Sequence, residues 1–399
     1  MEFRWEQRKL GDISDIQTGG TPKTKIKEYW NPKEIPWMSS GEINKKRIKK
    51  TDKKISIFGH ENSSARWIKK NSVLVALAGQ GKTRGLVAVN EINLTTNQSI
   101  AAIIPTESLY FEFLFHNLEK RYEELRSISS GDGTRGGLNK QLVSNLLIKL
   151  PAYDEQVKIG EILKKVDILI NLHQKRANKL MSVRQEFLNK IFEIHTDCEL
   201  RLRFNSFNDK WNKVSLGAVG KTQSGIGFPD SEQGGEVGIP FFKVSDMNKP
   251  GNEYEMLNAN NYVSEEQVEL RNWKPIEDLP AIMFAKVGAA IFLNRKRIIR
   301  TPFLIDNNTM AYIFDKNWDP IFGKTLFDTI NLAKYAQVGA LPSYNSKDIE
   351  SIVVYIPNLN EQIKVGKFFK EIDVIIEKNK DIINRLNVIK TSYLHKIFL

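Results

Sequence analysis

The segment LPAYDEQVKIGEILKKVDILI, residues 150–170, returns 206 positions later as IPNLNEQIKVGKFFKEIDVII, residues 356–376. Extended to residues 149–192 and 355–398, the two stretches align without a gap and share 14 identical residues in 44 positions. Both copies keep a proline, a Glu-Gln pair and a glycine near their start. A match of this length indicates that the chain is a tandem duplication of a unit of about 190 residues.

Shorter matches extend the repeat toward the start of the chain. Their offsets drift between 204 and 210, as loop insertions and deletions would produce. The matched pairs are Trp5-x4-Leu10-Gly11 with Trp211-x4-Leu216-Gly217, Gln17-Thr18-Gly19 with Gln223-Ser224-Gly225, Ile35-Pro36 with Ile239-Pro240, and Asn97-Gln98-Ser99 with Asn307-Asn308-Thr309.

Each repeat ends in a predicted long helix. Apolar residues recur in alternating steps of three and four over about five heptads, which is typical of a coiled coil. Asp154 and Asn360 suit the N-cap position. A helix of about 38 residues is roughly 57 Å long, which favours a spacer. Polar residues interrupt the pattern at His173 and Asn379. If the helices pack antiparallel, these two residues are expected to lie close together and set the register; alternatively, both face solvent.

The remainder of each repeat predicts a compact, mostly β domain. Short β-rich runs such as Ser72–Ala78 and Gly85–Val89 alternate with Gly- and Pro-marked turns. One amphipathic helical stretch is expected in each copy, at Glu107–Ile128 and at Asp319–Val338. The predicted fold class is α/β (α+β), with two mostly β domains separated by two long antiparallel coiled-coil helices in pseudo-two-fold symmetry. The predicted boundaries are 1–150 and 211–355 for the domains, 151–192 and 356–399 for the helices, and 193–210 for the linker.

The amino-acid composition narrows the classes of molecule that this chain is expected to bind. The 399 residues include 59 Lys and Arg against 47 Asp and Glu, a net charge of +12 that favours a polyanion, nucleic acid before membrane. Cys198 is the only cysteine, which excludes an intrachain disulfide and a cysteine zinc site, and five scattered histidines predict no metal site. The N-terminus lacks the apolar core of a signal peptide, and no apolar stretch is long enough to span a bilayer. We expect a cytoplasmic protein.

Motifs for catalysis are weak. Ala76–Thr83 loosely matches a phosphate-binding loop, but a β-type run follows it where such a loop needs a helix. The nuclease-like triplet Asp52-Lys53-Lys54 lacks a preceding Pro-Asp, and neither a methyltransferase Pro-Pro motif nor a Gly-x-Gly-x-x-Gly after a strand is present. We therefore expect no catalytic residue. An enzyme with an unrecognised site, or a protein–protein scaffold whose charge is incidental, stays open as an alternative.

Basic clusters and small polar loops are better candidates for function. Residues 45–54 carry seven cations and one acid, and such cations bind phosphates without reading sequence, although many basic runs are only solvated surface. Ser, Thr and Gln side chains on Gly-rich loops reach base edges in the major groove, although the same residues are ordinary turn formers. The candidate DNA contacts are Thr21, Lys23, Ser39, Ser40, Lys45, Lys46, Arg47, Lys49, Gln80, Lys82, Thr83, Arg84, Arg135, Ser224, Lys243, Ser245, Lys286, Arg295, Lys296, Arg297 and Tyr344.

The duplicated layout resembles the specificity subunit of type I restriction–modification enzymes over essentially the whole chain. Local motifs agree with its first target-recognition domain: Gln17–Pro22, Ile35–Met38, Ala78–Gly85 and Thr96–Ser99. Leu202-Arg203-Phe204, Phe207 and the Trp211 segment resemble the opening of its second one. The first repeat departs from this pattern, because no Leu-Arg-Phe preamble precedes its Trp5 motif.

The resemblance implies a non-catalytic adaptor. In the family, each target-recognition domain reads one half of an interrupted sequence in double-stranded DNA, and the two helices act as a ruler. The helices also dock two methyltransferase subunits that methylate adenine N6, and two restriction subunits complete the complex. S-adenosylmethionine, ATP and Mg would belong to those partners, so no cofactor is expected in this chain.

Overall fold

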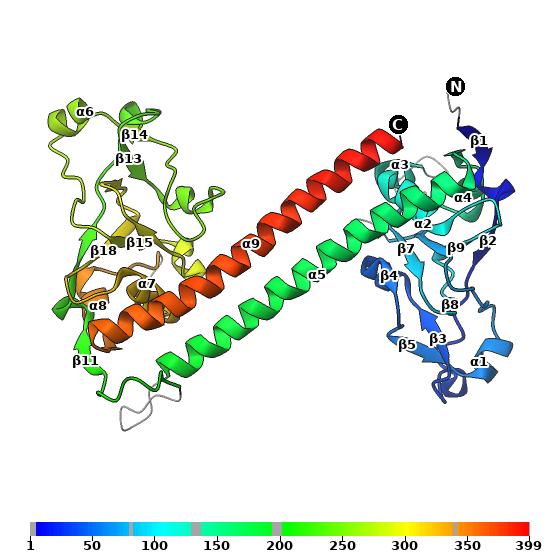
Figure 1. Cartoon of the computed structure of the whole chain (residues 1–399), viewed down its shortest axis with the longest axis horizontal. Coiled ribbons are helices and arrows are strands. Elements are labelled where there is room, and N and C mark those ends of the chain that lie inside the picture. The colour runs from blue at the N-terminus through cyan, green and yellow to red at the C-terminus, as the bar shows by residue number, and fades with distance from the viewer. Residues whose placement is uncertain (1–4, 80–82, 129–136, 194–201, 338–340, 399) are drawn as a thin grey trace. The chain divides into compact units, whose positions relative to one another are not determined.

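A computed structural model describes residues 5–79, 83–128, 137–193, 202–337 and 341–398 (Figure 1). The chain divides into two compact units. Unit 1 comprises Met1–Lys175 with Lys380–Leu399, and unit 2 comprises Arg176–Asn379. Each unit therefore holds one β-rich body, the beginning of one long helix and the end of the other. In the described part of the chain, no helix combines the length and the apolar character needed to cross a membrane.

Unit 1 contains three sheets. Their strand orders are β2-β9-β6-β7-β4, β5-β3-β8 and β1-β10. The strands are β1 (Glu6–Lys9), β2 (Ser14–Thr18), β3 (Ile35–Met38), β4 (Arg47–Ile48), β5 (Lys53–Ile55), β6 (Val73–Ala76), β7 (Val87–Asn90), β8 (Thr95–Thr96), β9 (Ile100–Pro105) and β10 (Leu147–Leu150). The shorter helices are α1 (Ile57–Glu61), α2 (Phe111–Lys120), α3 (Tyr122–Ser127) and α4 (Lys140–Ser144).

Unit 2 repeats this plan, except that an isolated bridge between Glu255 and Ile298 stands where unit 1 has β4. Its sheets are β12-β18-β15-β16, β14-β13-β17 and β11-β19. The strands are β11 (Asn212–Ser215), β12 (Gly220–Ser224), β13 (Ile239–Phe242), β14 (Tyr262–Val263), β15 (Ala281–Ala285), β16 (Lys296–Ile299), β17 (Leu304–Ile305), β18 (Thr309–Phe314) and β19 (Val353–Ile356). The shorter helices are α6 (Glu265–Leu270), α7 (Pro320–Thr329) and α8 (Ser346–Glu350).

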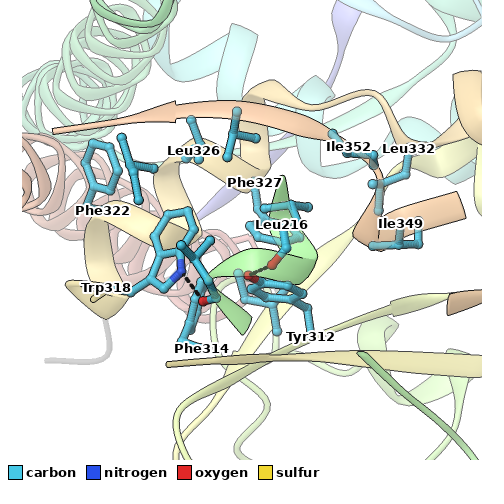
Figure 2. Packing of buried hydrophobic residues seen from close by; sticks show 14 of the residues in the cluster. Leu216, Tyr312, Phe314, Trp318, Phe322, Leu326, Phe327, Leu332, Ile349 and Ile352 are labelled. Atoms are coloured by element: carbon cyan, nitrogen blue, oxygen red, sulfur yellow. Dashed lines mark hydrogen bonds between the residues drawn. The ribbon is translucent and has the colours of Figure 1, made fainter. Parts of the chain in front are cut away.

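The cores form where one helix covers the main sheet of each unit. The central strands β6 and β15 are buried at every position, which explains their continuous apolar sequence. In unit 2, α7 packs aromatic side chains against β18 (Figure 2). Two buried aromatic polar groups find backbone acceptors there: Tyr312 Oη donates to the Leu216 carbonyl at 2.8 Å, and Trp318 Nε1 donates to the Val219 carbonyl at 2.7 Å. The helical stretches expected at 107–128 and 319–338 are confirmed in part: α2 and α3 occupy the first, and α7 occupies the beginning of the second.

The long helices are α5 (Tyr153–Phe192, 40 residues) and α9 (Leu359–Ile397, 39 residues). Both begin one residue before the predicted caps, so Asp154 and Asn360 lie in the first turn and the cap prediction is wrong. In α9 the side chain of Asn358 instead accepts a hydrogen bond from the Glu361 N–H at 3.1 Å. In each unit the two helices pack antiparallel: Asp167 meets Lys390 in unit 1 while Arg184 meets Asp373 in unit 2.

The repeated Gln and Gly anchor each long helix to its own domain. Gln156 accepts a hydrogen bond from the Tyr110 N–H at 3.0 Å, and Gln362 accepts one from the Asp319 N–H at 2.9 Å. One turn later, a Cβ at Gly160 would lie 2.9 Å from the backbone nitrogen of Phe113, and the same distance separates a Cβ at Gly366 from the Phe322 nitrogen. The duplicated Gln and Gly therefore allow α5 to pack closely against α2, and α9 against α7.

The predicted register pair is divided between the two units. His173 is partly buried in unit 1. Asn379 is buried in unit 2, where its side-chain amide donates to the Ile375 carbonyl of its own helix at 2.7 Å. The proximity of His173 and Asn379 stays a prediction.

Candidate nucleic-acid interface

Four loops of unit 1 meet at one edge of its sheets. Strands β2 and β6 end where β9 begins, because Thr18 pairs with Ala101 and Ala76 with Ile100. The end of β3 reaches the same place, since the Asn97 N–H donates to the Met38 carbonyl at 3.0 Å. We call residues 19–23, 39–40, 77–79, 83–84 and 97–99 loop edge 1.

Unit 2 builds the same edge from equivalent strands. Ser224 pairs with Met310 and Ala285 with Thr309. The Asp306 N–H donates to the Phe242 carbonyl at 3.0 Å, as Asn97 does to Met38 in unit 1. We call residues 224–228, 243–245, 286–288 and 306–308 loop edge 2. The equivalent of Asn97 is therefore Asp306, so the sequence match to Asn307 is wrong by one residue.

Loop edge 1 presents hydroxyl and amide groups. Thr21 Oγ1 donates to Gln98 Oε1 at 2.6 Å, which joins the loop after β2 to the turn before β9. Ser39 and Glu42 form a reciprocal capping box at the next loop. The glycine after β2 is required here, because a Cβ at Gly19 would lie 2.0 Å from the Thr96 carbonyl oxygen. The edge thus offers neutral donors and acceptors on closely packed backbone, beside the cations Lys23 and Arg84.

Loop edge 2 presents two ammonium groups. Lys286 Nζ lies 3.2 Å from Ser224 Oγ, which brings together two of the predicted residues. Lys243 Nζ donates to Gln233 Oε1 at 2.6 Å and lies 5.3 Å from the Phe228 ring centroid. Beneath them, Asp306 is buried, and this burial raises the pKa of its carboxyl. The two edges share a backbone plan but carry different side chains.

The structure places about half of the predicted DNA contacts at these edges. They are Thr21, Lys23, Ser39, Ser40, Thr83 and Arg84 at loop edge 1, and Ser224, Lys243, Ser245 and Lys286 at loop edge 2. Gln80, Lys82 and Arg135 lie outside the described residues. Sequence reasoning missed Gln98 and Asn308 at the edges and Gln233 beside Lys243, although the repeated segment that contains Gln98 was a signal for the first.

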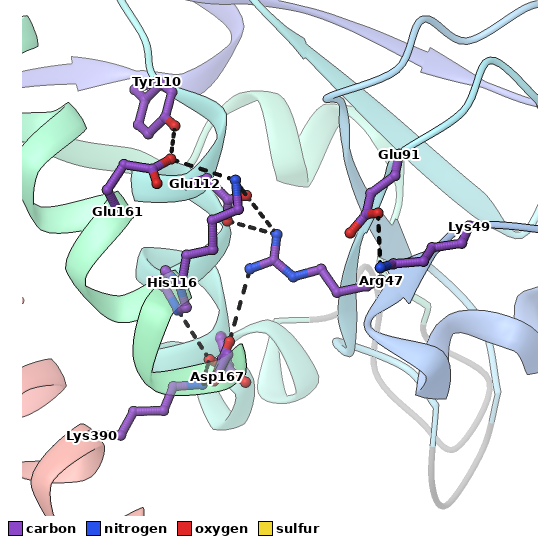
Figure 3. A network of polar contacts seen from close by, with 11 residues as sticks. Arg47, Lys49, Glu91, Tyr110, Glu112, His116, Glu161, Asp167 and Lys390 are labelled. Carbon is purple, nitrogen blue, oxygen red and sulfur yellow. Dashed lines mark hydrogen bonds and ion pairs between the residues drawn. The ribbon is translucent and has the colours of Figure 1, made fainter. Parts of the chain in front are cut away.

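Four of the seven cations in the lysine run have acidic partners within unit 1, and Figure 3 shows those of Arg47 and Lys49. Arg47 is only 15% exposed, and its guanidinium lies 2.7 Å from the buried carboxylate of Glu112. The other three predicted contacts of the run also have acidic partners within unit 1: Lys45 with Glu42 and Asp52, Lys46 with Glu119, and Lys49 with Glu91. The prediction of Arg47 as a phosphate contact is therefore at odds with its place in the interior of unit 1.

Two predicted contacts in unit 2 are buried. Lys296 is 2% exposed, and its ammonium donates to Asn294 Oδ1 at 2.9 Å and to the Ile330 carbonyl at 2.5 Å. Burial lowers the pKa of this lysine to about 8. Tyr344 is 3% exposed, and its hydroxyl donates to the Ala285 carbonyl. Lys296 and Tyr344 are thus structural residues, and their prediction as DNA contacts is wrong.

The two predicted contacts that flank Lys296 in sequence, Arg295 and Arg297, are partly buried. Arg295 donates to the Asn248 side chain, and Arg297 donates to the Lys296 carbonyl at 3.1 Å. Burial lowers the pKa of Arg297. Arg295 precedes β16 beside the end of β15, so it lies closer than Arg297 to loop edge 2.

One group of side chains in the described part of the chain has metal-ligand chemistry. Ligand atoms of His116, Glu119 and Asp167 lie within 4.8 Å of one another. However, Lys390 Nζ lies 2.6 Å from a carboxylate oxygen of both acids, so a protein cation already neutralises them. Burial alone would raise the pKa of Glu119, but the His116 hydrogen bond and the charges of Lys390 and Lys46 hold it well below its ordinary value. The group is best described as a structural ion network.

Comparisons with known proteins identify the repeat. The family model described as type I restriction modification DNA specificity domain matches twice, at residues 3–182 and 208–388. The MjaIX specificity subunit of Methanocaldococcus jannaschii is 26% identical over 98% of this chain and 92% of its own length. The EcoR124I/EcoR124II specificity subunit of Escherichia coli is 26% identical over 46% of both chains. The crystal structure of the S subunit from M. genitalium shares the fold, with a TM-score of 0.68, 16% identity, and coverage of 100% of this chain and 97% of that one.

Proposed function

Because the chain belongs to the family of type I restriction–modification DNA specificity proteins, we propose that it is the DNA-recognition subunit of such a complex. Loop edge 1 and loop edge 2 each read one half of a bipartite target in double-stranded DNA. The observation that carries this assignment is that equivalent strands build both edges while the side chains differ. Conserved backbone with divergent side chains is expected of two domains that perform the same task on different base sequences.

The side chains that differ between the edges predict different base contacts. At loop edge 1, Thr21, Ser39 and Gln98 supply donors and acceptors that match base edges. At loop edge 2, the ammonium groups of Lys243 and Lys286 supply donors alone, which suit guanine O6 and N7 or a phosphate. The two half-sites are therefore expected to differ in sequence.

The long helices offer matching apolar surface in the two units. In unit 1, Ile168 and Leu169 are 56% and 43% exposed, and their equivalents in unit 2, Val374 and Ile375, are 43% and 37% exposed. Exposed apolar residues at equivalent positions favour two equivalent docking sites for identical partners. We assign these sites to two adenine-N6 methyltransferase subunits, through which two restriction subunits join. S-adenosylmethionine, ATP and Mg belong to those partners, and the helices between the two domains act as a spacer.

The test is co-expression with the cognate methyltransferase in a methylation-free host, followed by sequencing of genomic adenine methylation. A bipartite motif with a fixed gap is expected only when both chains are present. Lys286→Ala should reduce methylation about tenfold or more and relax one half-site, whereas Gln98→Ala should relax the other, since each base contact contributes about 1–3 kcal/mol. Lys213→Ala, on the exposed strand β11, is the matched control.

Three results would contradict the assignment. Methylation by this chain alone would make it an enzyme. A soluble complex without salt-dependent DNA binding would favour the scaffold alternative, because phosphate contacts impose a steep salt dependence. A single substitution that alters both half-sites equally would separate the loop edges from target reading.

A further inference from the structure

In unit 2, a short segment before β11 covers the end of the helix pair. We call residues 202–207 the clip. Arg203 forms a bidentate ion pair with Glu361, at 2.8 and 2.7 Å, and Glu361 is only 1% exposed. Phe204 packs against Phe368 at a ring distance of 6.0 Å. The clip leaves a residual cavity of only about 170 Å³.

Lys364 holds the clip from its other side. Its ammonium donates to Ser206 Oγ at 3.1 Å and lies over the rings of Phe204 and Phe207, at 5.2 and 5.6 Å from their centroids. The clip is therefore recognised by an acid, a lysine and an apolar floor, all of which belong to the helix pair.

Unit 1 repeats the receiving surface without a clip among the described residues. A groove of about 770 Å³ is lined by Trp5, Glu155, Ile159, Lys396 and Ile397, together with Gln7 and Lys149. The first five are the repeats of Trp211, Glu361, Val365, Lys190 and Ile191, and all of these except Lys190 line the cavity beside the clip in unit 2. We call this surface the unit 1 groove.

The groove has the features of an unfilled site. Glu155 makes no side-chain hydrogen bond or ion pair with any described residue, whereas its repeat Glu361 is paired with Arg203. Ile162 is 53% exposed and Tyr393 is 48% exposed. Their repeats are Phe368, which lies under Phe204, and Phe187, which packs on Phe368 at 5.0 Å. Lys158 repeats Lys364 and is exposed.

We propose that the unit 1 groove is a docking site for a partner polypeptide that carries the pattern Leu-Arg-Phe-x-x-Phe. The arginine pairs with Glu155, the first aromatic ring covers Ile162 and Tyr393, and Lys158 stacks over both rings. A second copy of this chain is the less favoured occupant, because its own clip is held by Glu361 and Lys364. This inference goes beyond the proposed function and does not rest on it.

The test is fluorescence anisotropy of a labelled peptide RLRFNSFNDK, which copies residues 201–210, with the full chain. Saturable binding at one site is expected. Glu155→Gln in the chain should weaken binding about tenfold, because a charge-assisted pair contributes roughly that factor. Alanine in place of the peptide arginine that copies Arg203 should weaken binding by the same factor. Ile162→Glu, at an exposed position, should weaken it as well. Glu107→Gln, an exposed acid of unit 1 outside the groove, should leave the affinity unchanged.

Absence of saturable binding, or binding that ignores both Glu155→Gln and Ile162→Glu, would overturn the proposal. Light scattering of the full chain distinguishes the alternative occupant. A dimer that Arg203→Ala converts to a monomer would show that a second copy fills the groove, and the assignment to a partner polypeptide would then be wrong.

Discussion

The two units hold their helix pairs with the same aromatic group but with different polar contacts. Trp5, Phe113 and Phe398 pack edge to face in unit 1, as Trp211, Phe322 and Phe192 pack together in unit 2. Both units also place a cation between two acids, Lys390 in unit 1 and Arg184 in unit 2. Around these shared features, unit 1 adds the buried pair of Arg47 and Glu112, whereas unit 2 adds the clip. The comparison indicates that duplication preserved the contacts between helix and domain that tolerate no change of shape, while the surrounding charges diverged.

We expect the largest difference in stability between the two units when the cation that lies between two acids is replaced. Lys390 is 9% exposed between Glu119 and Asp167, which are 17% and 16% exposed. Its equivalent Arg184 is 18% exposed and faces Asp328 and Asp373, which are 25% and 26% exposed. Lys390→Met should cost unit 1 about 3 kcal/mol of unfolding free energy, because it removes the cation shared by two poorly hydrated carboxylates and leaves them only Lys46 and the more distant Arg47. Arg184→Met should cost unit 2 about half as much.

Hydrogen exchange under increasing urea, read separately in each unit, measures both losses. Equal losses in the two units would show that burial of the acids does not control the effect.

Substitution of the glycine near the start of each long helix should give the next largest loss of stability. Gly160→Ala places a methyl group 2.9 Å from the Glu112 Cβ and the Phe113 nitrogen, and Gly366→Ala places one 2.9 Å from the Phe322 nitrogen. Each substitution should cost its unit about 2 kcal/mol after the gain of about 1 kcal/mol in helix propensity. Urea unfolding of the matched variants measures the cost. A stabilising effect at either position would show that α2 or α7 is free to move away.

These positions also show how far sequence reasoning reached. The internal repeat predicted the paired domains and the long helices. It also pointed out the Gln and Gly positions, whose tight contacts the structure then explained. It could not show the partners of the basic run, since a run of lysines shows charge but not the acids that lie beside it on α2 and directly after β7. Lys296 and Tyr344 look like surface residues in sequence; only the register of β15 and β16 and the loop contacts reveal that they are buried.

Substitution of the acid near the start of each long helix tests how much the clip contributes to the stability of unit 2. Glu361→Gln weakens a bidentate pair to Arg203 that is buried on one side, so unit 2 should lose about 1 kcal/mol. Glu155→Gln in unit 1 should change stability by less than about 0.5 kcal/mol, because no described residue pairs with its carboxylate. Thermal unfolding of the two variants in parallel measures the difference. An equal loss from Glu155→Gln would show that the unit 1 groove is already filled within the chain.

The smallest effect at neutral pH is expected at Lys296, whose equivalent in unit 1 is the buried Val87. Strand register places Lys296 opposite Phe284 and Val87 opposite Val75. The acceptors of the lysine keep other donors, because Asn294 Oδ1 also accepts from the Leu332 N–H and the Ile330 carbonyl also accepts from the Asn294 amide. Lys296→Val should therefore change the stability of unit 2 by less than about 1 kcal/mol at pH 7.

The pH dependence then identifies the buried ammonium. The folded pKa of Lys296 is about 8, below the ordinary value of 10.5. Between these values the unfolded chain binds more protons than the folded one, so this group makes unit 2 more stable as the pH rises from about 8 to 10.5. Because other groups titrate in that range, the measured quantity is the difference between wild type and Lys296→Val, with exposed Lys213→Ala as control. A difference that stays constant across this window would show that the Lys296 ammonium is as well solvated in the fold as in the unfolded chain.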